Sequence, residues 1–258
     1  MSFDLSTFRL NSPLGKRILA ATREGNYAHP GEEEAIVRTL EPFALDLTHR
    51  WLDAGCGRGG TAAFIQNRGW ATVTAFDIDA VSIQEARANY PGIAFHECSV
   101  TDSAQVISDR FGLIYSFNAF YAFPDQPQAL ASLRDLANDA GKLIIFDYIN
   151  RGAFYKAALT RLPEGAHWKP VEENQIGATM QAAGWELEAV QNLDQDYDRW
   201  YAWLVERFDA RRGHLLTIAP PEVIDYTRNF YVLLLQAIRD GALGGGIFQA
   251  RAIAPAKE

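Results

Sequence analysis

The chain has 258 residues, of which 24 are Lys or Arg and 32 are Asp or Glu, so its formal net charge at pH 7 is -8. This acidic balance argues against nucleic acid or an anionic membrane surface as a main partner, and 48% hydrophobic residues exclude a mainly disordered chain. Two cysteines and the absence of a membrane-spanning apolar run predict a cytoplasmic protein without a disulfide framework, a signal peptide or membrane insertion.

Residues 31–150 alternate between amphipathic segments and short apolar runs. A 3.6-residue apolar period predicts helices, and apolar runs bounded by turn residues predict strands. Nearly continuous apolar strands between helices are typical of a parallel sheet that is covered on both faces. We predict strands at 50–54, 71–76, 93–96, 111–117 and 142–148, and helices from about residue 31 and over 61–69, 81–90 and 126–138.

The first of these helices opens with three consecutive acids, Glu32, Glu33 and Glu34. Acidic side chains in a first helical turn interact favourably with the helix dipole. We therefore interpret the triplet as helix-start chemistry and not as a metal site. The five histidines of the chain are dispersed and show no metal-ligand spacing, so no metal is expected.

The second half of the chain is richer in helices. The predicted helix at 196–212 is unusually aromatic, and at 100° per residue Trp203 does not share the face of Tyr197 and Tyr201. Such a helix is either buried on two sides or forms a lid, with one face on the sheet and the other lining a substrate cavity. Further helices are predicted at 172–183 and 221–239, a strand at 185–191, and a glycine turn at 244–246 that leads into a last strand at 247–253.

No linker divides the sequence, so a single domain over 1–258 is predicted. Its expected parts are an N-terminal helical leader (1–45), a cofactor-binding core (46–150), a substrate-side helical region (151–243), and a closing strand with a tail (244–258).

A glycine-rich turn follows the first predicted strand. Gly55, Gly57 and Gly60 satisfy the dinucleotide pattern G-x-G-x-x-G, which alone is a weak signal. Asp53, two positions earlier, discriminates between ligands. A carboxylate there would repel a pyrophosphate, whereas it would attract a ligand with a cationic amino acid end.

From Asp53 to Gly59 the turn resembles the first motif of the class I S-adenosylmethionine-dependent methyltransferases, an acid followed by Gly-x-Gly-x-Gly. Asp77 lies 22 residues after Gly55, where the second motif of that family has its acid. The resemblance covers about residues 50–150. It implies a Rossmann-like α/β fold with a seven-stranded, mostly parallel sheet, helices on both faces and an added helical lid. It also implies S-adenosyl-L-methionine as the cofactor.

The resemblance further implies a role for particular residues. Ser99 stands where the family usually has an acid that contacts the adenine amine, so this contact departs from the pattern. The predicted cofactor-binding residues are Asp53, Gly55 and Gly57 for the amino acid end, Asp77 for the ribose, Ile78, Ser99 and Val100 for the adenine, and Asn118 close to the sulfonium.

Candidate residues for proton transfer or substrate orientation are Tyr27, His29 and Tyr121. Each of these residues also has a non-catalytic interpretation, because a tyrosine near a strand end usually packs against the core and a loop histidine is usually solvated. Asp147 either holds a substrate amine or caps the next turn. The two cysteines have no visible histidine partner and are interpreted as small buried residues.

These features predict methyl transfer from S-adenosylmethionine to a small-molecule acceptor, with an amine nitrogen as the expected atom. The loose resemblance of the lid and leader to amine N-methyltransferases of the sarcosine and phosphoethanolamine type favours this atom. The alternatives are an O-methyltransferase that acts on a small hydroxylated or carboxylate acceptor, an NAD(P)-dependent oxidoreductase, and a non-catalytic S-adenosylmethionine-binding protein. We expect a monomer or homodimer.

Overall fold

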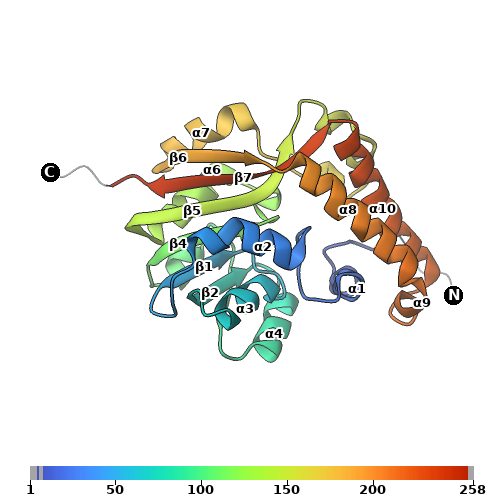
Figure 1. The fold of residues 1–258 in the computed structure, drawn as a ribbon, viewed down its shortest axis with the longest axis horizontal. Coiled ribbons are helices and arrows are strands. Elements are labelled where there is room, and N and C mark those ends of the chain that lie inside the picture. Colours follow the sequence, from blue (N-terminus) through green and yellow to red (C-terminus); the bar gives the residue numbers. More distant parts are fainter. Residues whose placement is uncertain (1–4, 6–7, 255–258) are drawn as a thin grey trace.

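A seven-stranded sheet organises the molecule (Figure 1). The computed structural model describes residue 5 and residues 8–254. The strand order is β3-β2-β1-β4-β5-β7-β6; β7 runs antiparallel to β5 and β6, and the other neighbouring strands are parallel. The predicted Rossmann-like, mostly parallel sheet is therefore confirmed. The strands are β1 (Arg50–Ala54), β2 (Thr72–Asp77), β3 (Ala94–Glu97), β4 (Phe111–Phe117), β5 (Ala137–Asn150), β6 (Trp185–Asn192) and β7 (Leu243–Ala252).

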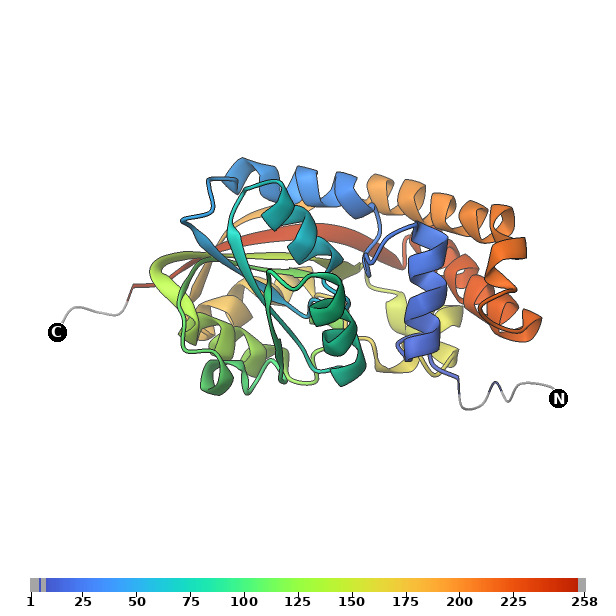
Figure 2. The ribbon, with the colours of Figure 1, turned by 90° about the horizontal axis from the view of Figure 1, so that it is seen from below.

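Helices cover both faces of this sheet, as predicted. Figure 2 shows α2 and α8 along one face and α6 and α7 along the other. One apolar core includes Ile36 of α2 and Leu204 of α8, and a second includes Leu133 of α6 and Met180 of α7. The helices are α1 (Pro13–Arg23), α2 (Glu32–Leu40), α3 (Gly60–Asn67), α4 (Ala80–Asn89), α5 (Ser103–Val106), α6 (Gln126–Asp135), α7 (Glu173–Ala182), α8 (Asp194–Ala210), α9 (Arg212–Leu215) and α10 (Pro221–Arg239).

Helix α1 belongs to the expected leader, but the sequence analysis gives it no bounds. Ser12 caps its N-terminus by accepting a hydrogen bond from Gly15 N at 3.2 Å, and Pro13 occupies its first turn. This Ser-Pro start is a recognisable helix signal. Among the described residues, no helix combines the length and apolar composition that crossing a bilayer requires.

The predicted helix at 126–138 is wrong at its C-terminal end. α6 ends at Asp135, and β5 begins at Ala137. Phe111 N donates to Leu136 O at 2.9 Å, and Ala137 pairs with Phe111 before an irregularity that shifts the register to Leu113 and Lys142. Pairing with β4 thus replaces the last helical turn, and Gly141 lies in the strand.

The predicted glycine turn at 244–246 is also wrong, because these three glycines lie inside β7 and pair with β5. A Cβ atom on Gly244 would lie 2.0 Å from Asp194 Oδ1, and one on Gly245 would lie 2.2 Å from the Tyr197 ring. Glycines in a strand often mark such a close approach. They let the N-terminal end of α8 lie directly on β7.

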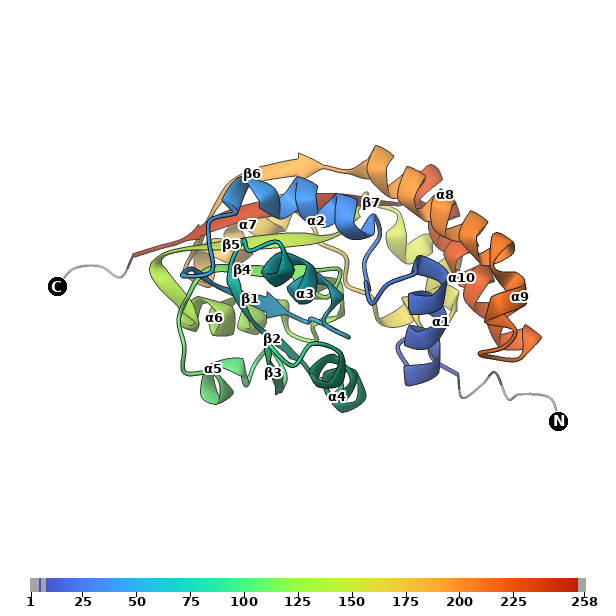
Figure 3. The same ribbon diagram turned by 60° about the horizontal axis from the view of Figure 1, so that its bottom comes forward.

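Helix α1 lies between the carboxyl ends of the parallel strands and the pair formed by α8 and α10 (Figure 3). Ion pairs join the acidic start of α2 to α8. Glu34 lies 2.5 Å from Arg199, and Glu32 lies 3.0 Å from Arg207. The acid triplet therefore also fastens the leader to the C-terminal helices, which sequence reasoning does not show.

Candidate functional site

The glycine-rich turn connects β1 to α3 at the carboxyl end of the sheet. Gly55, Gly57 and Gly59 have φ angles of 84°, 52° and 80°, in the left-handed region that favours glycine. A Cβ on Gly55 would lie 2.5 Å from Ala119 Cβ. A Cβ on Gly57 would meet only Ala28 Cβ, at 3.8 Å. The backbone of the turn can therefore come close to a ligand at Gly57.

Asp77 ties the glycine turn to the end of β2. Its Oδ2 accepts a hydrogen bond from Gly57 N at 2.7 Å, and its Oδ1 accepts one from Asp79 N at 2.9 Å. Each carboxylate oxygen has a second lone pair, so Asp77 can still accept hydrogen bonds from two hydroxyls. The structure thus brings together two residues that were predicted to bind the cofactor.

The residues predicted to hold an adenine follow β2 and β3. Cys98 N donates to Asp77 O at 3.1 Å, which places the loop after β3 beside the end of β2. Ile78 is 73% exposed and Val100 is buried. A large apolar side chain that is left this exposed beside a candidate ligand site is a suitable surface for a flat ring.

Ser99 uses its hydroxyl within its own loop. It donates to Asp102 Oδ2 at 2.7 Å, and Asp102 N donates back to Ser99 Oγ at 3.2 Å. Asp102 is an acid that sequence reasoning missed. The Ser-x-x-Asp spacing typical of a local side-chain turn could have found it.

Asp53 is a buried acid without a settled partner. Its side chain is on β1, between Ala75 of β2 and Tyr115 of β4. The residue is 2% exposed, and no described residue hydrogen bonds to its Oδ2. Burial raises the pKa of Asp53 to about 8, Tyr115 opposes this rise, and Asp77 adds to it. A cation bound here would supply the missing partner.

Asn118 follows β4 and has an unusual backbone. Its φ is 46°, and its backbone N donates to Phe146 O at 2.8 Å. Its side-chain Oδ1 accepts a hydrogen bond from the Tyr197 hydroxyl at 3.2 Å. Its Nδ2 is buried and has no hydrogen-bond partner among the described residues. An unpaired buried amide is costly, so Asn118 retains a donor for a ligand.

His29 is enclosed in the protein. Its ring contacts Phe117, with centroids 4.7 Å apart. Nδ1 lies 3.1 Å from Pro30 O, a hydrogen bond that requires the proton on Nδ1, so Nε2 accepts from the Thr61 hydroxyl at 3.0 Å. Burial lowers the pKa of His29 to about 3. A neutral imidazole thus joins the leader to the start of α3.

Tyr27 lies on the outer side of α3. Its hydroxyl donates to Glu33 Oε1 at 3.0 Å, and burial together with this bond raises its pKa. It lines a shallow hollow of about 320 Å³ with Phe64 and Tyr90. The structure does not join the Tyr27 hydroxyl to Asp53, Asp77 or Asn118 by any hydrogen bond.

Asp147 caps the turn that carries Tyr121. Its Oδ2 accepts from Tyr121 N at 3.1 Å, and its Oδ1 accepts from Tyr148 N at 2.7 Å. Burial raises the pKa of Asp147 to about 7, against the effect of these backbone donors. Asp147 is therefore a cap, but of the turn that precedes β5 in the chain and not of the next turn, which was the prediction.

An aromatic wall surrounds Tyr121. The Tyr121 ring lies 4.5 Å from Trp168 and 5.1 Å from Tyr148, and the Tyr148 hydroxyl is hydrogen bonded to that of Tyr201. Trp168 was missed from sequence because it lies in an irregular segment.

Trp203 is 47% exposed, so the outer part of the aromatic arc on α8 faces solvent and does not line a cavity. We use "tyrosine wall" for Tyr121, Tyr148, Tyr197, Tyr201 and Tyr231.

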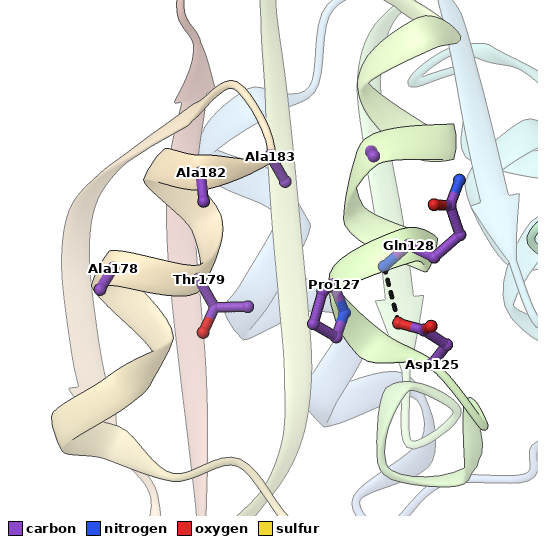
Figure 4. A pocket seen from close by; sticks show the side chains of 8 residues that line it. Asp125, Pro127, Gln128, Ala178, Thr179, Ala182 and Ala183 are labelled. Atoms are coloured by element: carbon purple, nitrogen blue, oxygen red, sulfur yellow. Dashed lines mark hydrogen bonds between the residues drawn. The ribbon is translucent and has the colours of Figure 1, made fainter.

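A hollow of about 550 Å³ lies elsewhere, between α6 and α7 (Figure 4). Asp125, one of the residues that line it, caps α6 by accepting a hydrogen bond from Gln128 N at 2.9 Å. The rest of its lining is small and mostly apolar, and includes none of the predicted site residues. Among the described residues, no group of three or more His, Cys, Asp and Glu side chains could hold a metal ion.

The fold and the glycine turn define a cofactor-binding α/β protein, and comparisons with known proteins identify its family. A family model described as a methyltransferase domain matches residues 17–190. The chain therefore belongs to the methyltransferase-domain family, as the resemblance to S-adenosylmethionine-dependent methyltransferases implies. S-adenosylmethionine, the expected cofactor, is the cofactor of this family. The unpaired Oδ2 of Asp53 and the open backbone at Gly57 fit such a cofactor.

Curated relatives match only in part. The methyltransferase GfsG of Streptomyces halstedii is 26% identical over 138 residues, which cover 52% of this chain and 49% of the relative. Trans-aconitate 2-methyltransferase of Rhizobium etli is 28% identical over 135 residues, which cover 52% of each chain. The chain thus matches about half the length of these relatives.

Solved structures share the whole fold. Phosphoethanolamine N-methyltransferase 2 of Haemonchus contortus, solved with S-adenosylmethionine, superposes with a TM-score of 0.83 at 16% identity. That match covers 95% of this chain and 59% of the other. The cyclopropane synthase MmaA2 of Mycobacterium tuberculosis gives 0.78 at 15% identity, covering 93% and 94%. At these identities the likeness shows the fold.

Proposed function

We propose that the protein transfers the methyl group of S-adenosylmethionine to an amine nitrogen of a small molecule. The observation that supports cofactor use most strongly is Asp53, a buried carboxyl at the start of the glycine turn whose Oδ2 has no hydrogen-bond partner among the described residues. A nicotinamide dinucleotide would bring a pyrophosphate to this turn and gain nothing from that acid.

In this proposal the cofactor extends along the carboxyl ends of β1, β2 and β4. Asp53 binds its ammonium group, and Asp77 accepts hydrogen bonds from its ribose hydroxyls. Ile78 packs on the adenine. The remaining assignments are Gly55 and Gly57 at the amino acid end, Ser99 and Val100 at the adenine, and Asn118 near the sulfonium.

When bound, the cofactor supplies an activated methyl group, and the protein contributes mainly orientation. Of the three candidate catalytic residues, we assign substrate orientation to Tyr121, which belongs to the tyrosine wall. His29 cannot accept a further proton near neutral pH, because its pKa is about 3 and both ring nitrogens are bonded. We assign His29 and Tyr27 to positioning the leader.

Two observations support an amine as the acceptor. Aromatic side chains such as Tyr148 and Trp168 lie beside Tyr121, and aromatic surroundings suit an amine that arrives as a cation and loses its proton before methylation. A structure of the Haemonchus contortus enzyme that superposes on this fold contains phosphomonomethylethanolamine, an amine. The name of the Rhizobium etli relative favours a second candidate, methylation of a carboxylate oxygen.

Calorimetric titration with S-adenosylmethionine, S-adenosylhomocysteine and NADH tests the cofactor assignment. We expect micromolar binding of the first two ligands and at least a tenfold loss in Asp77→Ala, because about 1.5–3 kcal/mol is typical for a hydrogen bond to a charged group. Asp109→Ala is the matched control, since the Asp109 side chain is 44% exposed and pairs with Arg50 before β4 begins. Binding of NADH alone would refute the proposal.

The acceptor is tested by methyl transfer from labelled S-adenosylmethionine to paired small molecules. Each pair consists of an amine and the alcohol or carboxylic acid of the same skeleton. Label in the amine products supports N-methylation. Label in an ester or ether would establish the O-methyltransferase alternative, and cofactor binding without transfer to any pair would favour a non-catalytic binder.

A further inference from the structure

We infer that Arg23 is the anchor for a carboxylate group on the methyl acceptor, so that the acceptor is a small aminocarboxylate. This inference deepens the proposed function and rests on it. It concerns a residue at the C-terminal end of α1, outside every motif that the sequence analysis singled out.

Arg23 is a buried cation whose hydrogen-bonding capacity is unused. Its side chain is 1% exposed, and neither Nε nor Nη1 has a hydrogen-bond partner among the described residues. The acid paired with it, Glu32, keeps Oε1 3.8 Å from Nη1, which is too far for a hydrogen bond. Both oxygens of Glu32 instead accept from Arg207 Nη2, at 3.0 Å.

This arrangement is unfavourable unless something else binds. A guanidinium offers five N–H donors and stays charged in proteins. A buried charge without hydrogen-bond partners carries a desolvation penalty that an anion can offset. Because neither Nε nor Nη1 hydrogen bonds to a nearby acid, the guanidinium retains donors for an anionic ligand group.

The location of Arg23 connects it to the proposed acceptor site. Burial raises the pKa of Tyr231 to about 12, and the neighbouring Arg23 charge opposes this rise. The same charge opposes the raised pKa of Tyr201 and lowers that of His29. Helix α1, which ends at Arg23, packs against α8, which carries Tyr197 and Tyr201, and Arg23 Nη1 lies 3.8 Å from Glu32 Oε1 at the start of α2. Arg23 thus lies beside the part of the tyrosine wall that α8 contributes.

The wall extends from Arg23 to the predicted methyl position. The Tyr201 hydroxyl is hydrogen bonded to that of Tyr148, and the hydroxyl of Tyr197, four residues earlier on α8, is hydrogen bonded to Asn118. Four residues advance about 6 Å along a helix. An acceptor that spans this interval places its carboxylate at Arg23 and its amine at Asn118, so the carboxylate is the anchor and not the methylated group.

The charges around Arg23 favour a carboxylate over a phosphate. Besides Glu32, Glu164 lies close enough to raise the pKa of Tyr231, and its Oε1 is buried and unpaired among the described residues. These acids partly neutralise the surroundings of the guanidinium, so they repel a doubly charged phosphate more than a singly charged carboxylate. The guanidinium can bind a planar carboxylate through two parallel N–H···O hydrogen bonds.

The test uses the full chain loaded with S-adenosylhomocysteine and observes the Arg23 Nε–H signal by NMR, assigned with Arg23→Lys. Glycine, β-alanine and 4-aminobutyrate are titrated beside their amides and inorganic phosphate. We expect at least one amino acid to shift this signal saturably, and its amide to leave it unchanged. The assignment of Arg23 as a carboxylate anchor is wrong if none of the three amino acids shifts the Arg23 signal. It is also wrong if the amides or phosphate shift the signal as strongly as the amino acids do.

Variants separate an anchor from a purely structural arginine. In Arg23→Gln we expect the amino acid to bind about 30-fold more weakly, because a bidentate charge-assisted pair is lost, while S-adenosylhomocysteine affinity stays within about threefold. Arg211→Gln is the matched control, since Arg211 also has a buried, unpaired Nε, is paired with Glu24 and should leave both affinities unchanged. Equal amino acid binding in wild type and Arg23→Gln would overturn the inference. Failure of the wild type to bind S-adenosylhomocysteine would instead overturn the proposed function.

Discussion

Asp53 should couple cofactor binding to the release of a proton. With a pKa of about 8, Asp53 is protonated in about nine molecules of ten at pH 7 when no ligand is bound. An ammonium group beside it favours the ionised carboxylate. Binding at pH 7 should therefore release up to about 0.9 proton from this residue.

The same argument gives the pH dependence of affinity. Ionising Asp53 at pH 7 costs about 1.4 kcal/mol when its pKa is about 8, and this cost disappears above that pKa. The contribution of Asp53 should therefore raise the affinity for S-adenosylhomocysteine about tenfold between pH 7 and pH 9. Titration of the ligand's own amine is subtracted by comparison with Asp53→Asn, which binds the same ligand without this carboxyl.

Calorimetry in buffers with different ionisation enthalpies measures the released protons directly. We expect the wild type to release close to one proton more than Asp53→Asn at pH 7. Equal release by the two proteins would refute the reasoning that Asp53 is neutral in the free protein and ionised in the complex.

Two further predictions concern the supports of the site. Gly245→Ala would place a Cβ 2.2 Å from the Tyr197 ring, so the ring must move away from Asn118. Such overpacking costs about 1–3 kcal/mol of stability. The melting temperature should therefore fall by about 2–10 °C. Gly213→Ala, with nothing within 4 Å, is the control, and equal melting temperatures of the two variants would contradict this argument. The pKa of His29 is about 3 in the folded protein and 6.5 in the unfolded chain. Between these two pH values only the unfolded chain binds a proton, so the free energy of unfolding decreases as the pH is lowered. Denaturant unfolding should show a loss of about 2 kcal/mol from pH 7 to pH 5 that His29→Gln removes; the same loss in both proteins would disprove it.

The sequence predicts best those features that local chemistry determines. Gly55, Gly57 and Asp77 are separated in the chain but are recognisable by residue type and spacing, and the structure joins Gly57 to Asp77. The roles of these residues toward a cofactor stay predictions. The alternation of apolar and amphipathic segments likewise gives the sheet and the helices on both faces.

Features that depend on distant partners are not visible in the sequence. The glycines at 244–246 look like a turn, and only the approach of Asp194 and Tyr197 explains why they lie in a strand. Arg23 looks like an ordinary end of a helix, because nothing local shows that it is buried. Asp147 is undecided in the sequence, since its partners are backbone amides of the preceding turn.

The position of β7 between β5 and β6 has a consequence for the choice of protein fragments. The family match ends at residue 190, yet β5 pairs along Lys142–Asn150 with β7, and β6 pairs only with β7 among the described strands. A fragment that ends at residue 190 would expose a long apolar edge on β5 and leave β6 without a neighbour. Such edges promote aggregation. The boundary of sequence similarity is therefore not a boundary at which this protein can be cut.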